Sequence, residues 1–407
     1  MTSDVGISIK GLKQKNLLLL LKLIATQPGL SRIDLAKITH LTKMTVTNII
    51  SELLELGIIT EEEGPASRQP TNGRIPTPLA LSSSAPKIIG VLIKRGLYQV
   101  VLGDLAGNIL DSVTERTPQL EDAGHLLRIL FAGVDTLRER ARGPLLAVGI
   151  SSIGPLDAPS GVLLNPPNFW GIENLPIVRE MEKHTGLPAF LINDGNAGAL
   201  CEKMYGSGKE IPNFLYVHLK YGIGSGLVLH NDLYHGNRGQ SGEIGHSTIN
   251  FVGPRCPCGN VGCLELYANI TNVRSFIAQQ LPLYPDTRIK DPAAVSLVHI
   301  IDLANQNDLL AVSALNEYCD YLSHAILNVL NILDISYIIM DYESNLSGSA
   351  LEDLLLRKLQ ARISDERFRT LRVLRSQHHG QAPLVGALAL VADNVFHGRL
   401  EIPLSSS

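Results

Sequence analysis

Long hydrophobic runs, aromatic residues and an excess of one charge are all scarce in this chain of 407 residues. The apolar run Leu17 to Leu21 near the start is far shorter than the roughly 20 residues that span a bilayer, so we expect no membrane insertion. The net charge of −4 gives no global sign of a polyanion-binding surface. With five cysteines and no basic, apolar leader at the start, we expect a cytoplasmic protein.

Three of the cysteines share one short loop. Cys256, Cys258 and Cys263 form a C-x-C-x4-C array in the stretch CPCGNVGC, where glycines let the chain turn back. His246, ten positions upstream, supplies a fourth ligand of the kind that tetrahedral zinc binds. A closed set of four ligands is typical of a structural zinc site. The alternatives are a disulfide or three unrelated thiols, and we expect the other two cysteines to be buried and inert.

The first 84 residues have the pattern of a winged helix-turn-helix. Ser31 is a good N-cap for a short helix, and Thr42 for a second helix that runs to about Leu56 and stops at Gly57. Apolar residues of the second helix recur at i, i+3, i+4 and i+7, which predicts a buried stripe. That stripe is Val46, Ile49, Ile50 and Leu53.

The other faces of this second helix carry short polar side chains, as a recognition helix in the major groove requires. A turn-rich segment follows and predicts a two-stranded wing with basic residues at its tip. The candidate DNA contacts are Lys43, Thr45, Thr47 and Asn48 on the helix, and Arg68 and Arg74 on the wing. The alternatives are a three-helix bundle that binds protein, and ordinary solvated charges at the two arginines.

From Lys87 onward, β-rich runs alternate with amphipathic helices, which predicts α/β organisation. The segment INDGNAGALCE places Asn193 and Asp194 at the carboxyl end of a strand, where α/β folds bind ligands. An amide beside a carboxylate suits vicinal hydroxyls. The proposed polyol pocket comprises Asn193, Asp194, Glu243, His246 and Glu265, with Asn168 beside Trp170 as an addition. Alternatively, Asn193 only caps a helix and Trp170 belongs to the core.

These segments together resemble the ROK family of repressors, open reading frames and sugar kinases, in particular its repressor branch, which includes the N-acetylglucosamine and xylose repressors. The matching segments are the winged helix-turn-helix, NPPNFWG, INDGNAGALCE, KYGIGSGLVL, SGEIGH and CPCGNVGCLE. The resemblance implies an actin-like, hexokinase-like, ribonuclease H-like body of two α/β lobes, with sugar in the cleft, assembled as homodimers or homotetramers. It assigns sugar binding to Asn168, Asn193, Asp194, Glu243, His246 and Glu265, and zinc to His246, Cys256, Cys258 and Cys263.

The chain departs from the kinase members of the family at three places. Where they have the D-x-G-x-T phosphate loop, Leu92 replaces the aspartate and Arg95 a glycine. In the second phosphate loop, bulky Lys220 and Tyr221 replace the first glycine and the threonine of G-T-G-I-G. Near the C-terminal end, Asp341 and Tyr342 replace a Gly-Gly nucleotide turn. Phosphoryl transfer depends on positioning and charge neutralisation around the phosphates. We therefore expect no catalytic residues, with Asp194, the base in kinases, only accepting a hydrogen bond.

We expect a DNA-binding domain at 1–84, a first lobe at 85–195 completed by a C-terminal helix at 385–407, and a second lobe with the zinc loop at 196–384. The predicted function is a transcriptional repressor of carbohydrate metabolism genes that a sugar or sugar phosphate releases from operator DNA. The alternatives are an ATP-dependent ROK sugar kinase and a DNA-binding regulator whose partner is a protein. The sequence leaves open which sugar binds, the operator, the direction of regulation and the oligomeric state.

Overall fold

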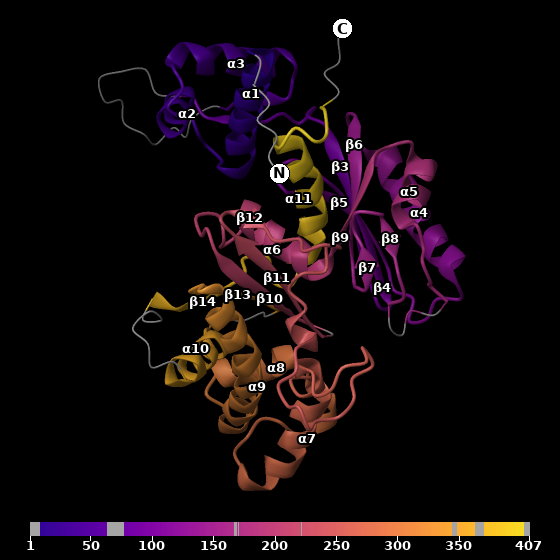
Figure 1. Ribbon diagram of the computed structural model, residues 1–407, viewed down its shortest axis with the longest axis vertical. Coiled ribbons are helices and arrows are strands. Elements are labelled where there is room, and N and C mark those ends of the chain that lie inside the picture. The colour runs from indigo at the N-terminus through magenta and orange to yellow at the C-terminus, as the bar shows by residue number, and fades with distance from the viewer. Residues whose placement is uncertain are drawn as a thin grey trace. The chain divides into compact units, whose positions relative to one another are not determined.

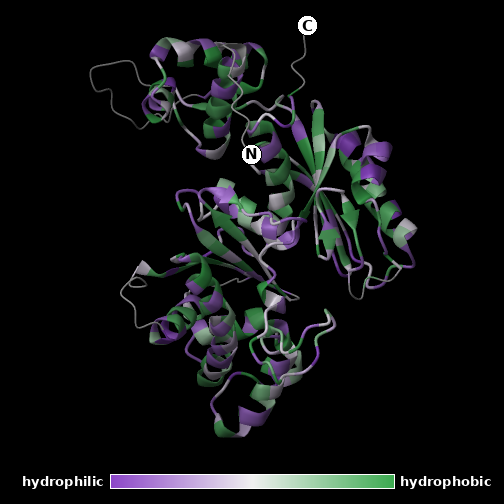
Figure 2. Cartoon of the chain, in the orientation of Figure 1, coloured by the Kyte–Doolittle hydropathy of each residue, from purple (hydrophilic) through white to green (hydrophobic). Residues whose placement is uncertain are grey.

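The computed structural model describes residues 9–62, 77–166, 169, 171–220, 222–343, 348–362 and 370–402 (Figure 1). The chain forms two compact units. The first contains Met1–Ile150, Ile177–Leu191 and Ala387–Ser407, and the second Ser151–Pro176 and Ile192–Gly386. Hydrophobic residues concentrate on the strands and on one side of the helices (Figure 2). Within the ranges given above, no helix is both long and apolar enough to cross a membrane.

The first unit begins with three helices, α1 (Ile9–Thr26), α2 (Arg32–Thr39) and α3 (Lys43–Glu55). Ser31 caps α2 in a capping box with Asp34, and the Thr42 hydroxyl accepts the Thr45 N–H at the start of α3. The predicted stripe of α3 is buried, as are Leu20, Leu21 and Ile24 of α1. Both predicted caps and the predicted core stripe are therefore confirmed.

The wing is a two-stranded antiparallel sheet of β1 (Ile59–Glu61) and β2 (Leu79–Leu81), in which Ile59 pairs with Leu81. Arg32 of α2 donates to Glu61 at 2.9 Å and ties the wing to the helices. The predicted wing contacts Arg68 and Arg74 lie outside the described residues. The predicted winged helix-turn-helix is confirmed.

A five-stranded sheet follows, with the strand order β5-β4-β3-β6-β9. Its strands are β3 (Lys87–Lys94), β4 (Leu97–Gly103), β5 (Ile109–Glu115), β6 (Leu145–Ser152) and β9 (Ala189–Asn193). The helices α4 (Ala123–Arg140) and α5 (Ile177–Thr185) belong to the first unit, as does the part of α11 (Ala382–Phe396) from Ala387 onward. Gly133 of α4 packs on Val100, whereas Leu388 of α11 packs on Gly90 and Gly103, so the two helices cover opposite faces of the sheet.

The second unit contains another five-stranded sheet, in the order β12-β11-β10-β13-β14. Its strands are β10 (Phe214–Leu219), β11 (Ile223–Leu229), β12 (Asp232–Leu233), β13 (Tyr337–Asp341) and β14 (Arg372–Arg375). Strands β10, β13 and β14 are parallel, whereas β11 and β12 are antiparallel to their neighbours. A small antiparallel pair, β7 (Leu156–Asp157) and β8 (Val162–Leu163), completes the strands of this unit.

Helices pack on both faces of the second sheet. They are α6 (Asp194–Tyr205), α7 (Ile270–Gln280), α8 (Leu297–Asn305), α9 (Leu309–Leu333) and α10 (Ala350–Arg362), with the short turns η1 (Ile244–His246), η2 (Leu264–Leu266), η3 (Leu281–Leu283) and η4 (Pro292–Ala294). Ala199 and Cys201 of α6 pack with Phe214 and Tyr216 on one face, whereas α7, α8, α9 and α10 form a larger core on the other. The amphipathic stretch at 316–333 forms most of α9, and its apolar residues, such as Leu322 and Ile326, lie in this core. The predicted mixed α/β fold is confirmed.

Replacing Gly198 of α6 by alanine tests how closely this helix packs. A Cβ there would lie 2.2 Å from the ring of Tyr216, whose hydroxyl donates to Asp341 at 2.7 Å and so resists displacement. Alanine favours a helix by about 0.5–1 kcal/mol, but overpacking costs about 1–3 kcal/mol. We expect a lower urea midpoint for Gly198→Ala than for the exposed control Ser275→Ala. Equal midpoints would show that α6 tolerates a methyl group here.

Candidate functional site

The junction of β9 and α6 places two of the predicted sugar residues. Asn193 ends the strand and caps the helix: its Oδ1 accepts the N–H groups of Gly195 at 2.9 Å and Asn196 at 3.4 Å. Its Nδ2 donates to Glu243 Oε1 at 3.4 Å. Asn193 therefore serves as a cap, and its amide nitrogen also points to another predicted sugar residue. Asp194, in the first turn of α6, is half-buried.

Three carboxylates gather at this junction. Glu243 precedes η1, and Glu265 lies in η2, where its Oε2 accepts the Ile223 N–H at 3.4 Å. Glu243 is exposed as a residue, yet protein surrounds its carboxylate on most sides. This desolvation, followed by the charges of Asp194 and Glu265, raises the pKa of Glu243 to about 7. The arrangement offers several hydrogen-bond acceptors at one place.

Glycines leave room around these carboxylates. A Cβ at Gly154 would lie 3.4 Å from Asn193 Nδ2 and 3.7 Å from Glu243 Oε1, and one at Gly222 would lie 2.6 Å from Glu265 Oε2. The Gln240 amide oxygen is 3.7 Å from the same Gly154 position. Sequence reasoning missed Gly154 and Gln240, because only their spatial neighbours mark them. Asn168 and Trp170 lie outside the described residues.

The predicted metal ligands come together in one cluster. The donor atoms of His246, Cys256, Cys258 and Cys263 all lie within 4.8 Å of one another. Cys258 Sγ and Cys263 Sγ are 3.7 Å apart, and Cys256 Sγ is 3.8 Å from His246 Nδ1. Two thiolates bound to tetrahedral zinc at about 2.3 Å would be about 3.8 Å apart. The donor set and its spacing therefore fit zinc, with Nδ1 as the histidine ligand.

The backbone of the zinc loop joins the cluster to the carboxylates. The His246 N–H donates to the Glu243 carbonyl at 3.1 Å, and Asn260 Nδ2 donates to the His246 carbonyl at 3.0 Å. Glu265 stands two residues after Cys263. Fixing the loop at four ligands would therefore fix the positions of both Glu243 and Glu265.

At the carboxyl ends of β10 and β13, Asp341 is fully buried among donors. Its Oδ2 accepts the Tyr216 hydroxyl at 2.7 Å and lies 3.0 Å from His218 Nδ1, while its Oδ1 accepts the Gly380 N–H at 2.6 Å. Burial alone would raise the pKa of Asp341, but the hydrogen bond and charge of His218, with Tyr216 and Gly380, lower it to about 2. Asp341 is thus an internal anion.

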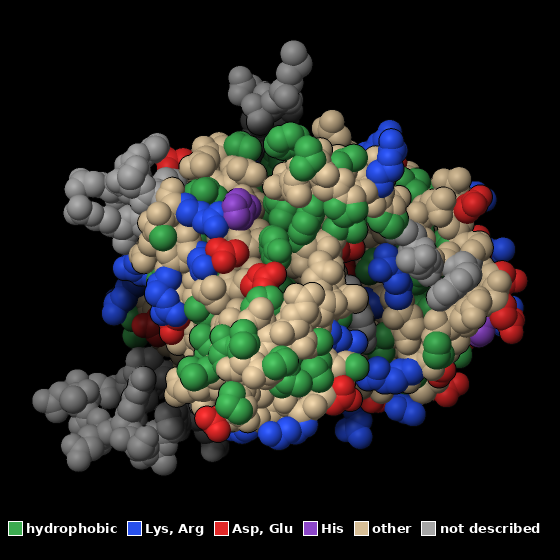
Figure 3. Space-filling model, turned by 90° about the horizontal axis from the view of Figure 1, so that it is seen from below, with side chains coloured by type: hydrophobic (Ala, Val, Ile, Leu, Met, Phe, Trp, Pro, Cys, Tyr) green, Lys and Arg blue, Asp and Glu red, His purple; other side chains and the backbone are tan. Residues whose placement is uncertain are grey.

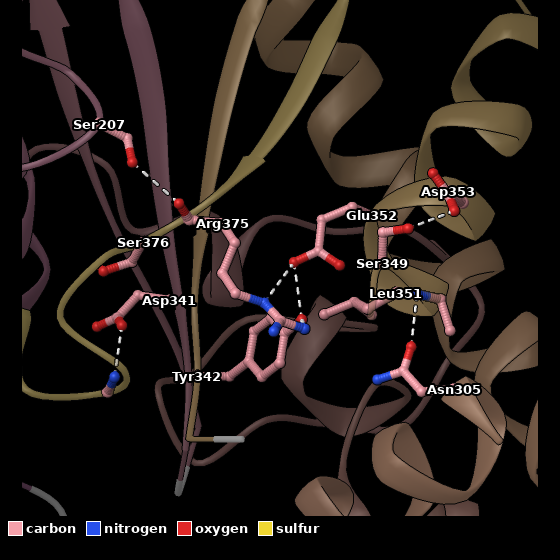
Figure 4. Close-up of polar contacts among 12 residues, drawn as sticks. Ser207, Asn305, Asp341, Tyr342, Ser349, Leu351, Glu352, Asp353, Arg375 and Ser376 are labelled. Atoms are coloured by element: carbon pink, nitrogen blue, oxygen red, sulfur yellow. Dashed lines mark hydrogen bonds and ion pairs between the residues drawn. The ribbon is translucent and has the colours of Figure 1, made fainter. Parts of the chain in front are cut away.

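The next residue, Tyr342, is enclosed as well (Figure 4). Its hydroxyl donates to Glu352 Oε1 at 2.7 Å, and the Arg375 guanidinium lies 4.7 Å from its ring centre. Arg375 Nε also donates to Glu352 Oε1 at 3.2 Å. Beside them, Lys220 pairs with Glu343. Internal polar contacts therefore surround the Asp341–Tyr342 pair, where the sequence predicts the loss of a Gly-Gly turn.

The predicted recognition surface is available on α3. Lys43, Thr47 and Asn48 are exposed, opposite the buried stripe. Thr45 is half-buried, and its hydroxyl lies 2.9 Å from the Thr42 hydroxyl at the helix cap. Three of the four helix candidates are thus free to reach base edges, whereas Thr45 also takes part in capping.

Known proteins match both parts of the chain. A winged helix-turn-helix DNA-binding model matches residues 13–60, and the ROK family model matches residues 89–394. The xylose repressor of Bacillus subtilis is 28% identical over 386 residues, covering 94% of this chain and 96% of the relative. The Escherichia coli transcriptional dual regulator NagC is 28% identical and covers 95% of each chain.

Solved structures agree with these sequence matches. A ROK family transcriptional regulator, described as a homologue of E. coli MLC, has a TM-score of 0.77 at 26% identity and covers 95% of this chain and 97% of its own. A ROK family glucokinase from Streptomyces griseus, in complex with glucose and AMPPNP, has a TM-score of 0.64 at 27% identity, over 75% of this chain and 98% of its own. The predicted resemblance is confirmed, and the chain belongs to the ROK family.

Proposed function

We propose that this protein is a transcriptional repressor of carbohydrate metabolism genes that binds operator DNA and releases it when a sugar binds at the β9–α6 junction. One observation carries the proposal: a winged helix-turn-helix with an exposed polar face on α3 precedes a body that gathers an amide and three carboxylates. The similar xylose repressor and NagC are regulators over nearly the same length. Such a regulator acts in the cytoplasm, where the operator is.

The sugar would bind through its hydroxyl groups. Asp194, Glu243 and Glu265 accept hydrogen bonds, and Asn193 and His246 add an amide and an imidazole. Carboxylates this close to one another repel a phosphate, so any phosphate on the effector would lie away from them. Asn168 remains a proposed sixth contact. Gly154 and Gln240 complete this proposed site.

Sugar phosphorylation is the alternative, since the glucokinase of Thermotoga maritima is 29% identical over 76% of this chain. Against it, Asp341 already takes up the N–H of Gly380 and two side-chain donors where the kinases have their nucleotide turn. Glu343 adds a second carboxylate beside Lys220. Negative groups at this place oppose a nucleotide. We therefore propose no catalytic activity; sugar-dependent ADP formation would overturn this.

We also propose that the repressor works as a homodimer or homotetramer. Two recognition helices would then read half-sites about 34 to 36 Å apart. Hydrophobic side chains cluster among charged ones on the face shown in Figure 3. Among the described residues of the second unit, the exposed large apolar side chains include Phe251, Val252, Leu283, Leu309 and Ile332. Exposed apolar groups of this kind support association.

For the cluster of three cysteines and one histidine we propose structural zinc. Bound there, zinc would cross-link the loop, whose own residues hold Glu243 and Glu265 in place. We expect Cys258→Ser to lose the metal, to melt at a lower temperature and to lose its sugar response. Metal analysis and thermal melting check this, with Cys201→Ser, a buried cysteine outside the cluster, as control. A metal-free variant of unchanged stability would contradict the site.

The raised pKa of Glu243 gives a second prediction. Because its folded-state pKa is about 7, above the ordinary 4.5, this carboxyl contributes stability below pH 4.5 that is lost as the pH rises through 7. Carbon NMR of labelled glutamate carboxyls should show a group titrating near 7 that Glu243→Gln removes. Glu202, whose pKa burial also raises to about 7, should remain in that variant as an internal control. Titration of Glu243 near 4.5 would contradict the crowding of the site.

The central test is fluorescence anisotropy on DNA from upstream of the protein's own gene, at fixed salt because phosphate contacts are salt-dependent. We expect one of xylose, glucose, N-acetylglucosamine or their phosphates to lower operator affinity at least tenfold. Asp194→Ala should bind operator but lose the sugar response, because it lacks a hydroxyl acceptor.

The matched variant Asn48→Ala should bind the sugar but weaken or relax operator recognition, since its amide faces outward from α3. Operator binding that no sugar changes would favour a protein effector instead. Absence of specific DNA binding would contradict the proposed function altogether.

A further inference from the structure

We propose that α11 transmits the sugar response from the second unit to the DNA-binding domain, with Gly386 and Gly398 as positioning residues. This inference rests on the proposed function. Helix α11 is continuous from Ala382 to Phe396, yet Ala382–Gly386 belongs to the second unit and Ala387–Phe396 to the first. Because one helix is shared, each unit has its own set of contacts with the same rigid element.

At its beginning, α11 contacts the helix that starts at the sugar residues. A Cβ at Gly386 would lie 2.1 Å from the Ala197 carbonyl oxygen and 2.8 Å from its Cβ. Ala197 stands one turn after Asn193 and Asp194 on α6. The two helices therefore meet backbone to backbone. No flexible side chain lies between them to absorb a shift of the first turn of α6, so such a shift would move α11.

Along its middle, α11 is clamped to the first sheet. A Cβ at Gly149 of β6 would lie 1.9 Å from the Ala387 carbonyl oxygen. Leu388 fills the space above Gly103, where a Cβ would lie 2.3 Å from its Cδ1. The residues from Ala387 to Ala392 are buried. Because it is packed in this way, we expect α11 to move as one rigid helix and not to bend.

At its end, α11 reaches the DNA-binding domain. The chain turns at Gly398, whose φ is +70° and whose Cβ position lies 3.3 Å from Leu18 Cδ1 of α1. Lys22, one turn further along α1, faces the carboxylate of Asp393, which His397 and Arg399 also contact. These charged side chains place α11 against one face of α1.

Helix α1 then leads to the recognition helix. Its Lys13 pairs with Glu52 of α3 at 2.6 Å, and Leu20 and Leu21 are buried in the domain. A change in the contact at Leu18 would therefore alter the placement of α3. The chain of contacts runs from α6 through α11 and α1 to α3, with each contact inside one unit.

The test compares operator affinity with and without sugar in Leu18→Ala, Asp393→Asn and the control Glu139→Gln, an exposed residue of α4. The probe is whichever of xylose, glucose or N-acetylglucosamine releases the unaltered protein. We expect the two contact variants to bind operator and sugar separately within about threefold of normal. In these two variants, the ratio of operator affinity without sugar to operator affinity with sugar should be at least fivefold smaller than in the unaltered protein. The control should keep the normal ratio. A merely structural role would lower melting temperature without changing this ratio.

Hydrogen exchange on the unaltered protein provides a second measurement if a variant fails to fold. The sugar should change exchange at 388–398 and at 15–22, and unchanged exchange in both segments would overturn the proposal. Contact variants that respond to sugar like the unaltered protein would overturn the coupling alone. An unaltered protein that binds operator but responds to no sugar would overturn the proposed function, and the coupling with it.

Discussion

The backbone packing of α6 is the constraint on which the rest of the structure depends. Its glycines bring it against β11 at Gly195, where a Cβ would lie 2.2 Å from the Ser225 carbonyl oxygen, and against Tyr216 at Gly198. On another side, Ala197 meets Gly386 of α11. These close contacts restrict how far α6 can move relative to its neighbours. Because Asn193 and Asp194 begin this helix, the site inherits that precision.

Two carboxylate sites of the second unit differ in their surroundings. Desolvation, followed by the charges of Asp194 and Glu265, raises the pKa of Glu243, which suits a site that accepts hydroxyl donors. Asp341, by contrast, is satisfied by Tyr216, His218 and Gly380 and has a lowered pKa. Donors from the chain itself surround Asp341, whereas Asp194, Glu243 and Glu265 bring several acceptors together at one place. This contrast is the physical basis for proposing a sensor rather than a kinase.

Local signals predicted the parts of the fold that depend on neighbouring residues. The caps at Ser31 and Thr42 and the buried stripe of α3 are such cases, and the structure confirms them. The motifs also led to the ROK family and the mixed α/β body, both confirmed. The metal ligands lie together, because a short glycine-containing loop fixes three of the four. The roles of the sugar and DNA residues and the three domain boundaries stay predictions.

Contacts between distant residues gave no signal in the sequence. Tyr216 meets Asp341 from 125 positions away, and Ser376 donates to Glu202 across 174. The C-terminal helix was expected to complete the first lobe, but no pattern indicated that its first turn packs on α6. Gly154 and Gln240 join the site for reasons that appear only in three dimensions. Periodicity and helix caps depend on neighbouring residues and can be read from the sequence. Contacts between distant elements depend on the folded chain, so the sequence alone does not reveal them.

We propose that sugar and operator DNA stabilise two different states of this one chain, so that each weakens the binding of the other. Calorimetry of sugar binding, with and without saturating operator DNA, measures this opposition. Linkage requires the operator to weaken sugar binding by the same factor by which sugar weakens operator binding. We predict equal factors of at least ten. Equal sugar affinity in the presence and absence of bound operator would contradict the account.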